Sequence, residues 1–104
     1  MKLHRALVLA AAIGCLAASG FSADQKTQDL YKSKCQACHG ADGKATPIGK
    51  KLGARDFQDP DVAKMSEDEL EKITKDGKNK MPGYKGKITD KQIDELVKYI
   101  KEIK

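Results

Sequence analysis

Residues 35–39 read Cys-Gln-Ala-Cys-His, and this short stretch decides what the rest of the chain can be. On a helix, two cysteines three positions apart project toward one side, and the adjacent histidine reaches the same region. The C-x-x-C-H pattern is the attachment motif of c-type haem, in which both thiols bond the porphyrin and the imidazole binds its iron. The motif predicts one covalently attached haem c per chain, with thioether links from Cys35 and Cys38 and an iron ligand from His39.

Other chemistries fit this motif less well. A structural zinc site needs four ligands, and Cys35, Cys38 and His39 supply three, so a carboxylate would have to be the fourth. A thioredoxin-like redox pair expects a preceding strand and a parallel sheet, which the sequence does not predict. A plain disulfide between cysteines this close would constrain almost nothing. Haem attachment is therefore the favoured interpretation.

The second axial ligand of the iron is expected to be a methionine. Apart from the N-terminal His4 there is no second histidine, which excludes a bis-histidine iron within one molecule. Met65 directly precedes a predicted helix start, where it is expected to pack as a hydrophobic staple. Met81 lies in a glycine- and lysine-rich loop, and Pro82 behind it stiffens the backbone. We therefore predict that His39 and Met81 are the two axial ligands.

The rest of the sequence predicts an all-α chain with three main helices and long loops. Strand patterns of alternating apolar and polar residues are missing, whereas apolar residues recur at helical spacing near the C-terminus. The expected elements are helices over 24–39, 66–77 and 89–103, short turns at 50–52 and 59–60, and loops over 40–58 and 77–88. Loops this long are uncommon in a small domain unless they enclose something.

The composition also predicts an interior filled by a cofactor. The chain has 104 residues, of which 34% are charged and 5% aromatic, with no tryptophan. This length allows one domain at most. A domain this small and this charged rarely builds a sufficient core from its own side chains. Something apolar is therefore expected to occupy the centre.

The N-terminal segment has the composition of a secretory signal. Lys2 and Arg5 precede an uncharged apolar run over residues 6–18, and small residues follow. The run is shorter than the ~20 residues that span a bilayer core. We expect a signal peptide over 1–23, cleaved somewhere between residues 19 and 24.

What remains after cleavage is one domain over residues 24–104. Export to the periplasm is the expected outcome. The alternatives are a photosynthetic lumen, an uncleaved anchor, or a membrane-anchored lipoprotein that carries lipid on Cys15.

With these motifs the chain resembles a small single-haem class I c-type cytochrome of the His/Met kind, as found in bacterial periplasms and photosynthetic lumens. The matching segments are CQACH at 35–39, GADG at 40–43, MPGYKGKITDKQI at 81–93 and VKYIKEI at 97–103. The resemblance implies a class I cytochrome c fold, in which the first and last helices cross and short helical turns wrap one haem with an exposed edge. It also implies that the Pro47 carbonyl accepts a hydrogen bond from the side-chain N–H of His39.

An iron with both axial positions filled implies a soluble one-electron carrier between larger redox proteins, not an enzyme. The sequence supplies no general base, nucleophile or substrate pocket, and His39 is committed to the iron. The alternative is a haem-based sensor or binding module, in which Met81 leaves the iron and a small gas takes its place. The strength of the bond between Met81 and the iron separates these two hypotheses.

The distribution of charge predicts which kind of partner surface the protein docks on. Seven lysines lie in the two loops that should flank the haem: Lys44, Lys50, Lys51, Lys78, Lys80, Lys85 and Lys87. The segment 56–71 is rich in acidic residues. This asymmetry predicts docking on acidic patches of the redox partners, against the alternative of an ordinary solvated lysine surface. Interspersed acidic residues disfavour nucleic-acid binding. We expect a monomer that contacts membranes only through its partners, unless Cys15 is lipidated.

Overall fold

The computed structural model describes residues 23–103, and helices are their only regular elements. The elements are α1 (Gln25–Lys34), α2 (Gln36–His39), α3 (Pro47–Lys51), α4 (Pro60–Ala63), α5 (Glu67–Asp76) and α6 (Asp90–Glu102). Within the described range no strand forms, and the only bridges are isolated ones, between Lys78 and Met81 and between Lys85 and Ile88. The predicted all-α class is confirmed.

The predicted signal peptide, apart from Ala23, lies outside the described residues, as does Cys15. Among the described residues, no helix is both long enough and apolar enough to cross a membrane.

The first predicted helix, over residues 24–39, is in fact two helices. The Asp24 carboxylate caps α1 and accepts a hydrogen bond of 2.8 Å from the backbone N–H of Thr27. Cys35 interrupts the helix because its φ of −119° departs from helical values, and it then serves as the N-cap of α2. Gly40 ends α2 with a φ of +74°, a conformation that favours glycine.

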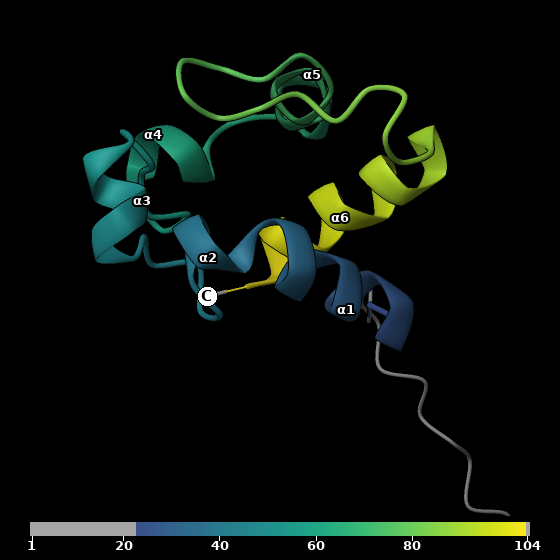
Figure 1. The fold of residues 1–104 in the computed structure, drawn as a ribbon, viewed down its shortest axis with the longest axis horizontal. Helices are drawn as coiled ribbons and strands as arrows, with labels where there is room; N and C mark the ends of the chain where they lie inside the picture. Colours follow the sequence, from purple (N-terminus) through teal and green to yellow (C-terminus); the bar gives the residue numbers. More distant parts are fainter. Residues whose placement is uncertain (1–22, 104) are drawn as a thin grey trace, which may run out of the picture.

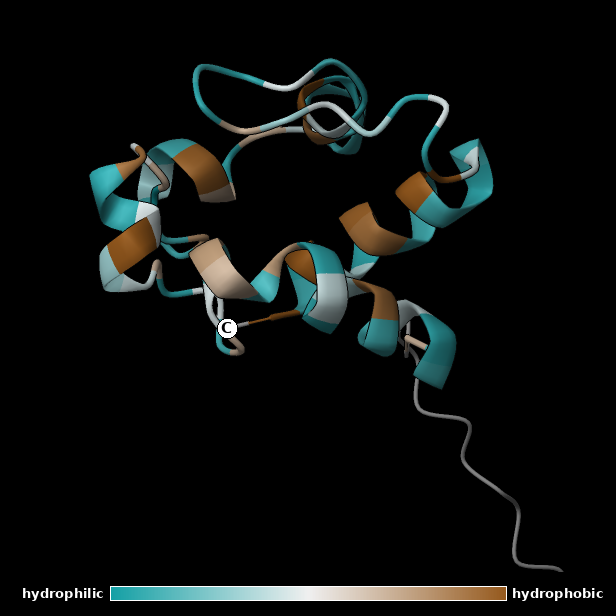
Figure 2. Ribbon diagram, viewed as in Figure 1, coloured by the Kyte–Doolittle hydropathy of each residue, from teal (hydrophilic) through white to brown (hydrophobic). Residues whose placement is uncertain are grey.

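The C-terminal helix α6 is the centre of the packing. A complete capping box at Thr89 and Gln92 starts it, the arrangement that the Thr-Asp-Lys-Gln sequence at 89–92 predicts. Its apolar face is fully buried at Ile93, Leu96 and Val97, and apolar and polar segments alternate along its ribbon (Figure 2). Burial of side chains of this size contributes about 1.5–3 kcal/mol each.

Both α1 and α5 pack on α6, as Figure 1 shows. At the α1 contact, the rings of Tyr31 and Tyr99 meet edge to face with centroids 5.2 Å apart. Thr27 Oγ1 donates to Glu95 Oε2 over 3.2 Å at the other end of that contact. The first and last helices are thus joined by both apolar and polar contacts.

Helix α5 begins and ends as the sequence predicts. Ser66 Oγ accepts a hydrogen bond of 3.1 Å from the N–H of Glu69, and Gly77 ends the helix with a φ of +79°. The Ser-Glu-Asp-Glu sequence at 66–69 predicts a full capping box, but its return bond, from the Ser66 N–H to the Glu69 side chain, is not formed in the described structure. Leu70, on the inner face of α5, packs with the apolar face of α6.

The loops between α2 and α5 are organised by short helices. Thr46 caps α3, which begins at Pro47, three residues before the turn predicted at 50–52. Asp59 caps α4 and Pro60 is its first residue, as predicted. In Figure 1, α3 and α4 lie together on one side of the molecule, between α2 and α5.

Candidate functional site

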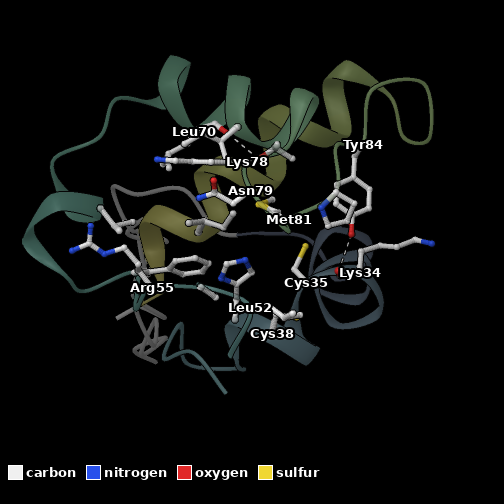
Figure 3. A pocket seen from close by; sticks show the side chains of 18 of the residues that line it. Lys34, Cys35, Cys38, Leu52, Arg55, Leu70, Lys78, Asn79, Met81 and Tyr84 are labelled. Atoms are coloured by element: carbon white, nitrogen blue, oxygen red, sulfur yellow. Dashed lines mark hydrogen bonds between the residues drawn. The ribbon is translucent and has the colours of Figure 1, made fainter. Parts of the chain in front are cut away.

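The helices surround a cavity of about 460 Å³ whose walls are mostly apolar. This volume lies in the range of small-molecule and cofactor sites, roughly 300–1,000 Å³. Cys35, Cys38 and His39 line the cavity from the α1–α2 segment, and Met81 lines it from the loop between α5 and α6. Figure 3 shows the sulfur atoms of Cys35 and Met81 directed into the same space. The structure therefore brings the two predicted attachment residues and the two predicted axial ligands together.

Apolar side chains from the other helices and loops complete the wall: Leu52, Phe57, Val62, Leu70, Ile73, Ile88, Leu96 and Ile100. The sequence predicted an apolar occupant but did not assign these residues to its surroundings. The helical spacing that placed Leu70 and Leu96 on inner faces was the available signal. Both residues are buried, so they serve the protein core and the cavity wall at once.

The two cysteines are half-buried free thiols. The backbone holds them near each other, because the N–H of Cys38 donates to the carbonyl of Cys35 over 3.2 Å. Burial, reinforced by the neighbouring Cys38, raises the pKa of the Cys35 thiol to about 11. Cys35 is therefore a protonated thiol at neutral pH.

These properties disfavour the other interpretations of the motif. Catalytic redox cysteines have a lowered thiol pKa, the opposite of Cys35. Within residues 23–103 no group of three or more histidine, cysteine or acidic side chains is placed to hold a metal ion. A four-ligand zinc site is thus not formed by the part of the chain that the structure describes.

His39 ends α2 with its ring turned inward. The ring stacks on that of Phe57, with centroids 4.9 Å apart and an interplanar angle of 26°. Burial lowers the pKa of the imidazole, which favours the neutral form that binds metals. Its Nδ1 atom is buried and has no hydrogen-bond partner. A buried polar atom without a partner is unusual, and the predicted bond to the Pro47 carbonyl would supply one in the haem-bound protein.

The region of Pro47 packs closely against α2. The N–H of Thr46 donates to the carbonyl of Cys38 over 3.0 Å, and Gly49 lies so near that carbonyl that a Cβ there would clash with it. The structure forms no hydrogen bond from His39 Nδ1 to the Pro47 carbonyl. The contact between Pro47 and His39 remains a prediction for the haem-bound protein.

Met81 is held by a tight turn of the α5–α6 loop. Its N–H donates to the Lys78 carbonyl over 2.9 Å, and its carbonyl accepts from the Lys78 N–H over 3.2 Å. Asn79 between them takes a φ of +54°, which asparagine tolerates better than most residues. The turn presents the half-buried Met81 thioether to the cavity opposite His39 and the cysteines.

Three residues of the cavity were missed or only partly recognised from the sequence. Met65 packs against the apolar core, as a staple residue should, but it also lines the cavity. Asn79 and Tyr84 line it from the Met81 loop. The scarcity of aromatic residues makes Tyr84 one of four candidates for ring packing, with Tyr31, Phe57 and Tyr99, but does not place it at the cavity.

The chain is similar to several known proteins. A family model described as cytochrome C oxidase, cbb3-type, subunit III, matches residues 22–100. The chain is 30% identical to cytochrome c6 of Synechococcus elongatus over 71 residues, which cover 68% of this chain and 79% of that protein. It is also 30% identical over 71 residues to cytochrome c6 of Thermosynechococcus vestitus, covering 62% of that relative. The solved structure of the KustC0563 c-type cytochrome superposes with a TM-score of 0.70 at 32% identity, covering 75% of this chain and 96% of that one.

The chain belongs to this family of c-type cytochromes. Its cofactor is covalently attached haem c, and the cytochrome is a haem-based electron carrier. The described cavity fits that group on three counts. Two free thiols line it without being joined in a disulfide, a half-buried imidazole lines it beside them, and the rest of its wall is mostly apolar.

Proposed function

We propose that this cytochrome is a soluble one-electron carrier that shuttles electrons between larger redox proteins, with His39 and Met81 as axial ligands. The observation that carries the proposal is that the C-x-x-C-H segment and the Met81 loop line opposite sides of one cavity of about 460 Å³. When bound, the haem iron accepts and releases a single electron. The side chains of this chain set the conditions for that exchange.

The thiols of Cys35 and Cys38 form the thioether links. Covalent attachment fixes the ring without a large apolar pocket, which suits a chain with few large side chains. Burial raises the pKa of the Cys35 thiol to about 11, so this thiol stays protonated at neutral pH, and both cysteines would hold the haem as thioethers.

His39 supplies the first axial ligand as a neutral imidazole. Its stacking on Phe57 restricts the ring, so the nitrogen lone pair keeps one direction. The predicted bond from the other ring nitrogen to the Pro47 carbonyl would fix the tautomer.

Met81 supplies the second axial ligand. A thioether favours the reduced iron and therefore raises the reduction potential compared with more basic ligands. It also closes the position that dioxygen or carbon monoxide would need. A carrier benefits from both effects, because the iron then changes oxidation state with little movement and few side reactions.

The lysines around the cavity favour an acidic partner surface. All seven of the lysines predicted to flank the haem are exposed. Lys50 and Lys51 lie at the end of α3, and Lys78 and Lys80 line the cavity. A positive rim around the redox centre steers negatively charged partners and speeds their encounter. We propose that the exported protein meets such partners in the periplasm as a monomer.

An absorption spectrum of the exported, haem-loaded protein tests this proposal. A thioether-to-ferric-iron charge-transfer band, with a ferrous spectrum unchanged by carbon monoxide, is the expected result. A missing band together with a shift on adding the gas would favour the sensor hypothesis, in which the Met81 ligand is labile.

A further inference from the structure

The Met81 loop is fastened to α5 by its backbone. The N–H of Tyr84 donates to the Thr74 carbonyl over 2.9 Å, and the N–H of Lys85 donates to the Lys75 carbonyl over 3.1 Å. Gly83 lies against the backbone of the last α5 residues, where a Cβ would clash with the Lys75 carbonyl. The loop and α5 therefore form one unit.

The cysteines and His39 belong to a different unit, formed by α1 and α2. Both α1 and α5 pack on α6, so α6 connects the two units. Between residues 77–88 and the α1–α2 segment, the described structure contains one hydrogen bond. Tyr84 Oη donates to the backbone carbonyl of Lys34 over 3.1 Å, as the dashed line in Figure 3 shows. Lys34 directly precedes Cys35.

The Tyr84 ring is well placed to transmit that contact. It lines the cavity and is half-buried. Its own carbonyl accepts from the Lys87 N–H over 2.9 Å, and the Lys87 ammonium lies over the ring at 5.8 Å from the centroid. The turn continues into Ile88, which packs against the core. Backbone, ring face and following turn thus all restrict where the hydroxyl points.

We infer that Tyr84 is a positioning residue whose hydroxyl clamps the Met81 loop to the segment carrying Cys35, and so controls how readily Met81 leaves the iron. This inference rests on the proposed Met81 ligand. The clamp bond exists when the loop is seated and is lost when the loop swings away. It therefore stabilises the seated state selectively.

The size of the effect follows from the net contribution of one hydrogen bond. Removing the hydroxyl while keeping the ring should raise the population of the open loop by between about three- and tenfold. An external ligand binds the iron only when Met81 has left it. Its apparent affinity therefore rises by the same factor as the open population.

Imidazole titration of the ferric cytochrome measures this affinity. Tyr84→Phe is expected to bind imidazole about three- to tenfold more tightly than the wild type. Tyr99→Phe is the matched control, because it removes a phenol hydroxyl that has no hydrogen bond among the described residues. Tyr99→Phe should titrate like the wild type, and equal shifts in the two variants would overturn the clamp.

A second control separates the clamp from general loosening. Thr27→Val removes a side-chain hydrogen bond from the α1–α6 contact. It should lower the unfolding midpoint and leave the imidazole affinity unchanged. If it raises that affinity as much as Tyr84→Phe does, the clamp is refuted.

The charge-transfer band distinguishes failure of the clamp from failure of the ligand assignment. A wild type that lacks the band overturns the Met81 ligand and the clamp together. A wild type that shows the band, with Tyr84→Phe titrating identically, overturns the clamp alone.

Discussion

The ring of His39 lies almost parallel to that of Phe57, with centroids 4.9 Å apart, and Phe57 in turn meets Tyr31 edge to face at 6.5 Å. Tyr31 is 1% exposed and belongs to the α1–α6 contact. The proposed iron ligand is therefore connected to the helix crossing through one aromatic side chain. This connection couples the orientation of the imidazole to the packing of the fold.

Replacing Phe57 should weaken this connection. Phe57→Leu keeps an apolar wall but loses both ring contacts, and we expect the free energy of unfolding of the haem-loaded protein to fall by about 1–2 kcal/mol. Guanidinium denaturation measures the change. Ile48→Ala is a suitable control, because Ile48 is 64% exposed and should lose less. Equal losses in the two variants would show that the aromatic contacts contribute nothing specific.

Removal of the haem attachment should leave a chain without a stable fold. The cavity has a volume of about 460 Å³, and the apolar residues lining it would face water if it were not filled. We expect the haem-free double variant Cys35→Ser with Cys38→Ser to show no cooperative thermal transition by circular dichroism. Ala37→Ser, at an exposed position of the same motif, should fold with haem. A cooperative transition in the double variant would disprove the dependence on haem.

Features set by local chemistry could be predicted from the sequence. Caps at Asp24, Asp59 and Thr89 depend on residues within three positions of one another. Asp59 and Thr89 form the caps that the sequence predicts, and Asp24 is the cap of α1 among the two candidates Asp24 and Thr27. The C-x-x-C-H motif is local in the same way. The break at Cys35 was not predicted, because no glycine or proline marks it in the sequence.

Features set by distant contacts could not be predicted. The bond from Tyr84 to the Lys34 carbonyl joins residues 50 positions apart, and no periodic pattern reports such a pair. The participation of Met65 in the cavity wall depends likewise on how α5 and α6 pack. Sequence patterns identify which face of a helix is buried, whereas the partners of that face follow from the assembled fold.

The assignment of the methionine ligand can be tested with a matched pair of variants. Both Met65 and Met81 line the cavity, so each carries a thioether near the proposed haem site. Met81→Ala should lose the charge-transfer band, lower the reduction potential and let carbon monoxide bind the ferrous iron. Met65→Leu should keep the band, because it exchanges one apolar staple for another. Loss of the band in Met65→Leu, with retention in Met81→Ala, would reverse the assignment.

The lysines of the Met81 loop that line the cavity should govern the rate of electron transfer to charged oxidants. Lys78 and Lys80 lie at the cavity, so Lys78→Glu with Lys80→Glu places two negative charges where a partner would approach. We expect oxidation of the ferrous protein by ferricyanide, an anion, to slow by about three- to tenfold at low ionic strength. The difference should shrink as salt is added, since screening shortens the range of these charges to about 3 Å at 1 M. Stopped-flow absorbance measures both rates.

A variant pair with the same change in net charge supplies the control for that experiment. Lys26 and Lys91 are exposed at the starts of α1 and α6, and neither lines the cavity. If Lys78 and Lys80 steer the oxidant, Lys26→Glu with Lys91→Glu should slow the oxidation less than twofold. The reason is that the oxidant responds mainly to charges near the site of electron exchange. Equal slowing by the two pairs would mean that total charge alone sets the rate, and the lysines of the Met81 loop would then have no special place in partner recognition.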